Sequence, residues 1–155
     1  MRKKTELAMV VVLILAAIFA APKSAEYVIN MKAKTTVPVV VIDAGHGADD
    51  PGKVGVSGTE EKDLNLEIAL RLRDYLTEQG MEVVMTREED ISLAEESASS
   101  VKVSDLKKRV EIINGANAAL AVSIHQNSYT DSAVSGAQVF YYGDSAEGKL
   151  LAESL

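Results

Sequence analysis

Two histidines and one glutamate are the residues of this chain whose chemistry first suggests a functional site. His46 lies between two glycines just after a run of β-branched residues, and His125 follows another apolar run, in the sequence SIHQNS. Glu61 lies 15 residues after His46 and 64 residues before His125. Two imidazoles and one carboxylate form one of the usual ligand sets of catalytic zinc, which keeps a fourth position for water.

These spacings do not by themselves enforce a shared metal site. No helical register joins the three residues, so a sheet must bring them together. Two histidines in an acidic domain also occur as a solvated surface pair, or as one core residue and one loop residue. The glycines around His46 suit a tight turn, and Glu60 and Glu61 suit a helix N-terminus. On residue types and spacing alone, the metal site and the ordinary structural interpretation both stay open.

Four apolar runs predict the strands that would position these residues. Val37–Asp43 is a continuous β-branched run and predicts a strand buried on both faces. Residues 81–86, 119–124 and 137–142 predict the other three strands. The polar, small-residue stretch at 88–102 predicts a mobile loop.

Helical periodicity predicts three helices between and after these strands. The first follows the glycine-rich loop, ends at Gly80 and carries an apolar face at Leu64, Ile68, Leu72, Tyr75 and Leu76. The second is capped by Ser104, stops around Asn114-Gly115 and carries Leu106, Val110 and Ile113. Ser145 opens the third.

The alternation of strands and helices predicts an α/β domain with helices on both faces of a mainly parallel, or mixed, central sheet. Loops beyond the carboxyl ends of parallel strands line the ligand crevice. We therefore expect His46 and His125 at the same edge of the sheet, with the glycine-rich loop folding back to bring Glu61 between them.

Charge and composition exclude several classes of function. Residues 1–36 hold six of the 16 basic side chains and two of the 23 acidic ones, so the other 119 residues carry 10 positive and 21 negative side chains. That balance argues against a nucleic-acid partner, which needs clustered Lys and Arg. The chain has no cysteine, which excludes disulfides, thiolate metal sites and cysteine nucleophiles. About 120 residues are enough for one core and too few for two ordinary domains.

The N-terminus has the pattern of an export signal. Arg2, Lys3 and Lys4 precede the apolar run LAMVVVLILAAIFAA, so residues 1–21 predict a secretory signal peptide. An uncleaved membrane anchor is the alternative, because the Pro-Lys pair after the alanines is not a clean processing site. Residues 22–36 predict a linker. Either interpretation places residues 37–155 outside the cytoplasm, in contact with the membrane only through the N-terminal segment.

Three separated motifs resemble the zinc-dependent N-acetylmuramoyl-L-alanine amidases of bacterial cell walls, amidase type 3. They run in order from about Val37 to Tyr142 and read VVVIDAGHGADDPGKVG, then GTEEKDLNLEIALRLRDYL with TREED, then LKKRVEIINGANAALAVSIHQNS. The sequence SIHQNS, followed by GAQVFYY, is most similar to the sporulation-associated, germination-specific branch of this family.

The resemblance implies a zinc ligand set and a reaction. It places Zn²⁺ on His46, Glu61 and His125, and it favours Glu61 over Glu60 because Glu61 directly precedes Lys-Asp as in the family's pattern. The implied fold is a phosphorylase/hydrolase-like amidase domain. The implied reaction on peptidoglycan is zinc-assisted hydrolysis of the amide between N-acetylmuramic acid and L-alanine of the stem peptide, with a role in spore cortex maturation.

The resemblance also shows departures. The family often has a proline where this chain has Ala44 and a second glycine where it has Ala48; neither change removes a ligand. The family's catalytic glutamate lies near its C-terminus, and nothing before Leu155 matches it. We therefore expect residues 37–155 to be the N-terminal part of the catalytic domain, with the general base beyond Leu155.

Four further residues are candidates for supporting roles. Asn127 beside His125 is a candidate for substrate contact, or an ordinary turn-former. Arg87 and Arg109 are candidates for binding the carboxylates of a peptide stem; surface ion pairs with Asp90 or Glu111 are the more common use of such residues. Asp43 is a candidate hydrogen-bond partner of a ligating histidine, or it satisfies turn amides at the strand end.

Other functions compete with the amidase. A non-catalytic peptidoglycan-binding or regulatory domain would keep the fold without turnover. A zinc peptidase of another fold also fits two histidines and a glutamate, but the HExxH motif is absent. The acidic domain should be repelled by anionic wall polymers, so we expect an accessory activator protein to be one way of bringing it to its substrate.

Overall fold

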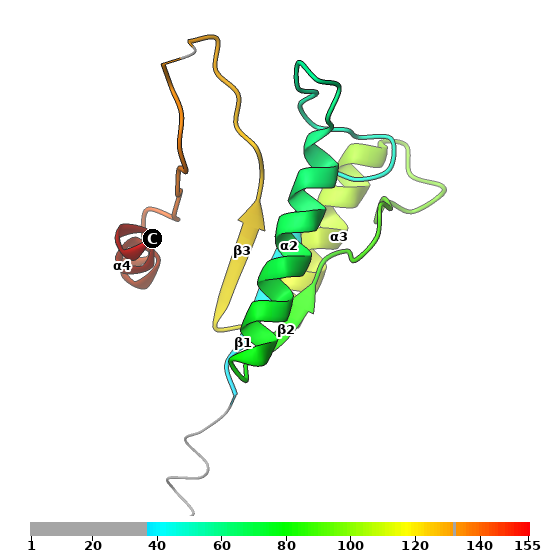
Figure 1. Ribbon diagram of the computed structural model, residues 1–155. Helices are drawn as coiled ribbons and strands as arrows, with labels where there is room; N and C mark the ends of the chain where they lie inside the picture. The colour runs from blue at the N-terminus through cyan, green and yellow to red at the C-terminus, as the bar shows by residue number, and fades with distance from the viewer. Residues whose placement is uncertain (1–36, 132) are drawn as a thin grey trace, which may run out of the picture.

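The computed structural model describes residues 37–131 and 133–155, and three parallel strands form its central sheet (Figure 1). The strands are β1 (Val39–Ala44), β2 (Glu82–Met85) and β3 (Leu120–Ile124), in the order β2-β1-β3. All pairings are parallel, with β1 in the centre. The predicted α/β class and three of the four predicted strands are confirmed, each within about two residues of its expected start.

Two helices cover opposite faces of this sheet. The apolar side chains of Val40, Ile42 and Ala44 point to α2 (Glu61–Glu78), where they pack around Ala69. The intervening side chains of β1 point to the other face, which α3 (Val101–Gly115) covers. The two crossovers, β1 to β2 and β2 to β3, run in opposite directions across the sheet, so a right-handed connection places their helices on opposite faces.

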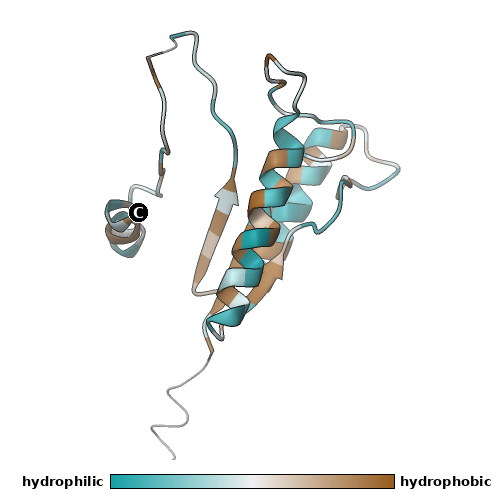
Figure 2. Cartoon of the chain, viewed as in Figure 1, coloured by the Kyte–Doolittle hydropathy of each residue, from teal (hydrophilic) through white to brown (hydrophobic). Residues whose placement is uncertain are grey.

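The face that α2 turns to the sheet differs from the predicted one. Its buried residues are Glu61, Asn65 and Ala69, whereas Leu64 and Ile68 are 39% and 44% exposed. Leu72 and Leu76 pack against the core as predicted; Tyr75 is exposed. The small side chain of Ala69 lets the helix approach β1 closely, and the polar residues before it face the carboxyl end of the sheet. In Figure 2 the strands are coloured as hydrophobic, while α2 carries both kinds of residue.

Local signals at two of the three helices act as predicted. Gly80, at φ 79°, follows α2 as its C′ residue and donates its N–H to the carbonyl of Thr77, while Met81 donates to Leu76. This pair of bonds is a Schellman motif. Ser145 caps α4 (Ala146–Ser154), because its hydroxyl oxygen accepts a hydrogen bond from the backbone N–H of Gly148 at 2.9 Å.

The predicted start of the second helix is wrong by one turn. α3 begins at Val101, and Ser100 occupies the N-cap position without a side-chain cap bond. The hydroxyl of Ser104 accepts a hydrogen bond from the backbone N–H of Glu95 instead. The capping ability of Ser104 is therefore used by the preceding loop. The end of α3 at Gly115 agrees with the prediction.

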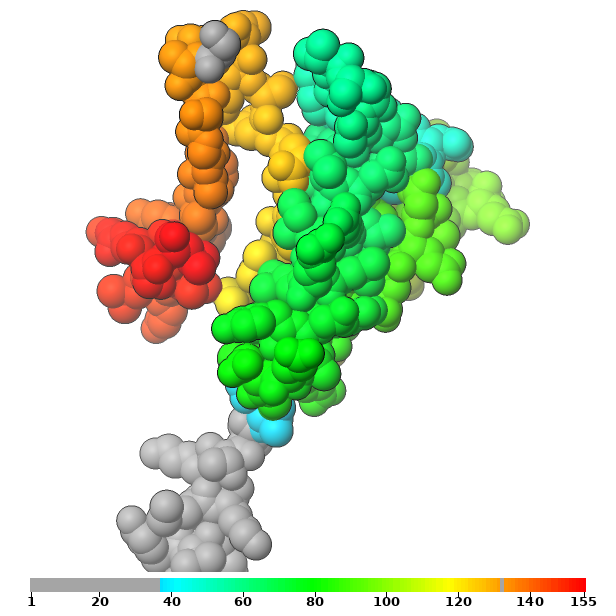
Figure 3. Space-filling model, viewed as in Figure 1, coloured from blue at the N-terminus to red at the C-terminus, as the bar shows by residue number. Residues whose placement is uncertain are grey.

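The predicted fourth strand at residues 137–142 is not formed. This segment pairs with no strand in the described part of the chain, and Val139, Phe140 and Tyr142 are 47%, 81% and 76% exposed. A β-branched and aromatic pattern favours a strand only beside a neighbouring backbone, and here none lies alongside. In Figures 1 and 3 the segment after β3 runs away from the sheet before it reaches α4.

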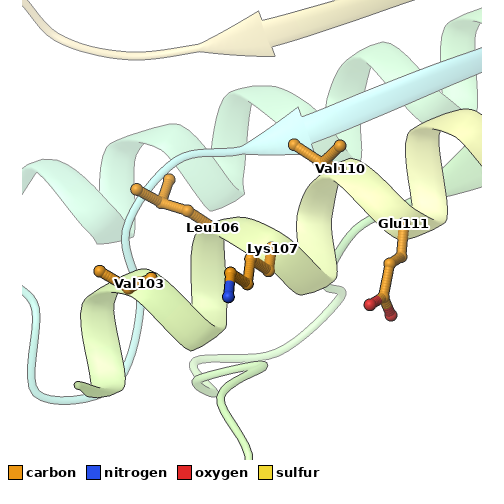
Figure 4. Close-up of a pocket in the computed structure, with 5 residues that line it drawn as sticks. All are labelled: Val103, Leu106, Lys107, Val110 and Glu111. Atoms are coloured by element: carbon orange, nitrogen blue, oxygen red, sulfur yellow. The ribbon is translucent and has the colours of Figure 1, made fainter. Parts of the chain in front are cut away.

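A shallow apolar groove of about 430 Å³ lies along α3. Val103, Leu106 and Val110 form a row on one side of the helix, with Lys107 and Glu111 beside them (Figure 4). The three apolar side chains are each more than half exposed. They follow the spacing of a buried helical face, but the described residues cover that face only in part.

The predicted signal peptide or anchor at residues 1–21 and the predicted linker at 22–36 lie outside the described residues. Of the helices in the described ranges, none has the length and apolar character needed to cross a membrane.

Candidate metal centre

Three elements bring His46, Glu61 and His125 together at the carboxyl edge of the sheet. His46 lies in the loop after β1, Glu61 is the first residue of α2, and His125 directly follows β3. One potential ligand atom from each residue lies within 4.8 Å of the other two. The strand order changes direction at β1, which is where open parallel sheets form their ligand crevice. The three residues lie at one edge of the sheet, as their positions in the sequence predicted, and they could hold one metal ion.

The carboxylate of Glu61 lies between the two imidazoles. Its Oε1 atom is 3.3 Å from Nε2 of His46 and 3.0 Å from Nδ1 of His125. The two rings meet edge to face, with centroids 4.8 Å apart and an interplanar angle of 83°. The Glu61 side chain is 6% exposed and that of His125 is 51% exposed. The site is thus buried on the carboxylate side and open on the His125 side.

The environment of Glu61 keeps its carboxylate ionised. Burial alone would raise its pKa, but hydrogen bonds donated by the backbone amides of Lys53 and Gln126, together with one from His125, lower the pKa to about 2. The two amide bonds measure 2.8 Å and 2.9 Å. Glu60, the alternative considered from the sequence, lies 3.3 Å from the ammonium group of Lys62 instead. In the structure Glu61 therefore faces the two histidines, whereas Glu60 faces Lys62.

Asp50 is a second carboxylate, besides Glu61, that contacts a histidine of the His46–Glu61–His125 cluster. Its Oδ2 atom lies 3.0 Å from Nδ1 of His46, and its Oδ1 atom accepts a hydrogen bond from the amide of Gly52. The bond with His46 lowers the pKa of Asp50. A proton on Nδ1 pointing to Asp50 leaves Nε2 free to bind a cation on the Glu61 side, an arrangement common around metal-bound histidines. The role of Asp50 was not identified from the sequence. The signals available there were its residue type and its separation of four residues from His46.

Asp43, the residue expected in this supporting role, points elsewhere. Its carboxylate accepts hydrogen bonds from the hydroxyls of Thr86 and Ser123 and from the guanidinium of Arg109, at 2.8, 2.6 and 2.7 Å. Burial opposes ionisation, but these three donors lower its pKa overall. Asp43 therefore acts on the site through Arg109, which in turn binds the backbone carbonyl of His46 at 2.7 Å.

Asn65 also supports the cluster and was not identified from the sequence. It is fully buried one turn after Glu61, and its amide donates to the carbonyl of Gly45 at 3.2 Å. Its side-chain oxygen accepts a hydrogen bond from Gln126. Asn65 thus joins the loops that carry the two histidines. The only signal for Asn65 in the sequence was a polar residue one helical turn after Glu61.

The three residues predicted to bind substrate have different surroundings. Arg87 and Arg109 are 2% and 5% exposed, so the surface ion pairs considered for them are not formed. Their guanidinium groups lie beneath the His46 loop and donate mostly to backbone carbonyls. Asn127 is exposed and donates to Tyr129 and Gln138. Its role toward substrate stays a prediction.

Two glycines let the ligand side chains pack against the backbone. A Cβ atom at Gly45 would collide with the imidazole of His125. A Cβ atom at Gly52, which has φ 67°, would lie 2.6 Å from the ring of His46 and 2.7 Å from the carboxylate of Glu61. Glycine at these two positions is therefore required by space, and at Gly52 also by backbone conformation.

A pocket of about 600 Å³ opens beside the cluster, toward the start of α3. Both histidines line it, and its charged lining includes Asp49, Asp50, Asp105 and Lys102. The cluster is therefore reachable from a cavity large enough for part of a peptide or sugar.

Comparison with known proteins decides the family. Residues 40–155 match the family model of N-acetylmuramoyl-L-alanine amidases. This chain belongs to the N-acetylmuramoyl-L-alanine amidase family. The germination-specific N-acetylmuramoyl-L-alanine amidase of Bacillus subtilis is 48% identical over 118 residues, which cover 74% of this chain and 49% of that protein.

Solved amidase structures have the same fold. The CwlD amidase from Clostridioides difficile, determined in complex with the GerS lipoprotein, is 41% identical with a TM-score of 0.71, over 74% of this chain and 61% of that one. The catalytic domain of the CwlV amidase from Paenibacillus polymyxa is 42% identical with a TM-score of 0.53, over 63% of this chain and 50% of that one. This chain spans about half the length of the curated Bacillus subtilis relative.

Proposed function

We propose that this chain carries the zinc-binding part of an amidase that hydrolyses the bond between N-acetylmuramic acid and L-alanine of the peptidoglycan stem. The observation that supports this most is the meeting of His46, Glu61 and His125 at the carboxyl edge of the sheet, in a chain that belongs to the amidase family. The sequence alone left a shared site open; the geometry favours it.

The donor set suits zinc better than calcium or magnesium. Calcium and magnesium prefer oxygen ligands, whereas two imidazole nitrogens and one carboxylate form a three-ligand catalytic zinc set with one position left open. Glu61, with a pKa of about 2, is anionic at neutral pH and offsets part of the cation's charge. Asp50 orients the ring of His46 so that Nε2 faces the same point.

The residues of this chain prepare the site for amide hydrolysis. When bound, zinc supplies an acidified water and polarises the scissile carbonyl. Glu61 holds its position through two backbone amides, and the exposed side of His125 leaves room for a substrate to approach from the neighbouring pocket. The resemblance assigns the general base to a glutamate of the family's C-terminal region, and that assignment stays a prediction.

We infer that the natural substrate is spore cortex peptidoglycan and that the enzyme works outside the cytoplasm. The name of the 48% identical Bacillus subtilis relative supports the link to germination. The lipoprotein bound to the Clostridioides difficile relative supports an accessory envelope protein as partner. The basic and apolar pattern of residues 1–21 supports export.

Zinc content per chain tests the metal centre. We expect close to one zinc per wild-type chain and almost none in His125→Ala or Glu61→Gln. Glu60→Gln is the matched control, because it removes the neighbouring carboxylate, which is turned to the ammonium group of Lys62. Equal zinc loss in Glu60→Gln and Glu61→Gln would refute the ligand assignment.

Peptide release from purified peptidoglycan tests the reaction. The purified wild-type protein should expose new L-alanine amino groups, measured by amine labelling and mass spectrometry, and the His125→Ala variant should not. Cortex and vegetative peptidoglycan are compared side by side. Zinc binding together with wall binding but without release would favour the non-catalytic alternative.

A further inference from the structure

The loop that carries His46 has a strained backbone. His46, Gly47 and Ala48 have φ values of 64°, 143° and 49°, so three successive residues adopt positive φ and two of them are not glycine. A non-glycine residue in this conformation is destabilising and persists only where the surroundings hold it in place. The contacts that hold this loop therefore control where the His46 imidazole lies.

Arg87 provides contacts on both sides of the cluster. Its Nε and Nη2 atoms donate to the carbonyls of Ala44 and Gly45 at 2.9 and 3.0 Å, directly before His46. Nη2 also donates to the carbonyl of Lys62 at 2.8 Å, directly after Glu61. A single planar guanidinium thus joins the backbone beside one proposed ligand to the backbone beside another.

The partners of Arg87 are unusual for a buried cation. Among the described residues, its four hydrogen bonds all go to backbone carbonyls, the fourth being that of Glu89 at 3.0 Å, and none goes to a carboxylate. Burial lowers its pKa, as expected for a desolvated cation. A buried cation without a carboxylate partner lowers the stability of the fold. The rigid planar fork of the arginine guanidinium binds several carbonyls at once, which the single ammonium group of lysine cannot do in the same geometry.

Arg109 holds the same loop from the α3 side. It donates to the carbonyls of Ala44 and His46 and is itself held by the carboxylates of Asp43 and Asp105. The carbonyl of Ala44 therefore accepts from both arginines. Arg109 does not reach α2, whereas Arg87 links the two ligand-bearing segments from beneath. Asn65 and Lys62 add bonds from α2 to the carbonyls of Gly45 and Ala48, but Arg87 is the one side chain among these that bonds to the backbone of both segments.

We propose that Arg87 is a positioning residue of the metal centre, which sets the separation between the His46 loop and the first turn of α2. This inference rests on the proposed zinc site. Arg87 therefore has a structural role beneath the site in place of the predicted role in binding substrate carboxylates, because four of its five N–H donors bind backbone carbonyls and its side chain is buried.

Replacing Arg87 by lysine in the full chain tests the proposal. Lysine keeps the charge but cannot bridge four carbonyls in one plane. We expect at least about tenfold weaker Co²⁺ affinity, the lower end of the loss seen for residues that orient metal ligands, and an altered visible absorption band of bound Co²⁺. Arg71→Lys is the matched control, because the Arg71 side chain is 78% exposed and pairs with Glu67 on the outer side of α2.

The outcomes separate this proposal from the metal centre itself. A wild-type chain that binds no Co²⁺ refutes the centre and the positioning role together. A folded Arg87→Lys variant with wild-type Co²⁺ affinity and spectrum refutes the positioning role alone, even if its thermal stability is lower. If Arg87→Lys does not fold, the Arg87→Ala variant is refolded in the presence of methylguanidinium instead. We then expect the refolded variant to show the wild-type absorption band of bound Co²⁺. A variant that folds with methylguanidinium but lacks this band overturns the proposal.

Discussion

Replacing Glu61 by glutamine should remove a pH-dependent part of the stability of the metal-free protein. The pKa of Glu61 is about 2 in the folded chain, against an ordinary value of 4.5. Each pKa unit corresponds to 1.36 kcal/mol, so the ionised carboxylate stabilises the fold by about 3 kcal/mol at neutral pH. The Glu61→Gln variant should be less stable than wild type by about that amount at pH 7.

The sign of the pH dependence follows from the lowered pKa. A carboxyl group whose pKa is depressed by folding contributes its full stabilisation above the unfolded value of 4.5 and loses it as the pH falls toward 2. The stability gap between wild type and Glu61→Gln should therefore be constant from pH 7 to about pH 6. It should shrink to about half by pH 3.

Urea unfolding followed by circular dichroism, with a chelator present, measures this gap at each pH. Glu60→Gln serves as control: its carboxylate is 38% exposed and contacts Lys62, so we expect a loss of less than about 0.5 kcal/mol. A gap between wild type and Glu61→Gln that stays the same from pH 7 to pH 3 would refute the electrostatic account of this residue.

Three further substitutions test the surroundings of the cluster. Asp50→Asn removes the carboxylate that orients the imidazole of His46. The zinc affinity, measured by chelator competition, should fall about tenfold or more with little change in the fold. Gly45→Ala should displace the ring of His125 and abolish stoichiometric zinc, as metal analysis would show; full occupancy would contradict the close packing of this ring on the backbone. Asp43→Asn leaves the buried guanidinium of Arg109 without one of its two carboxylates, so the free energy of unfolding should drop by about 3 kcal/mol or more in a urea titration.

Much of the fold follows from local sequence signals. Three of the four predicted strands form, because the β-branched runs can be buried in a parallel sheet whatever the details of packing. Gly80 and Ser145 end and begin their helices as expected, since both act through bonds within four or five residues. Residues 137–142 show the limit of such signals, because a strand also needs a neighbour that its own sequence does not specify.

The surroundings of the site depend on contacts between distant parts of the chain. Ser104 has the residue type of a helix cap, yet the loop before α3 uses its hydroxyl. Arg87 and Arg109 have the residue type of surface cations, yet the crossovers bury them under the His46 loop. Neither outcome can be read from neighbours in the sequence, because the acceptors of both arginines lie 25 or more residues away in most cases.

The amino-acid sequence alone makes two imidazoles and one carboxylate the candidate chemical groups of this protein, each next to a predicted strand end or helix start. Residue type and spacing left it open whether these three groups share one site, and the family resemblance favoured a shared site. Tertiary packing selects Glu61 rather than Glu60 to face the histidines, and it makes Asp50 orient His46 while Asp43 supports Arg109. These choices depend on how two crossovers set β1, α2 and β3 against one another, and that arrangement is a property of the packed sheet as a whole.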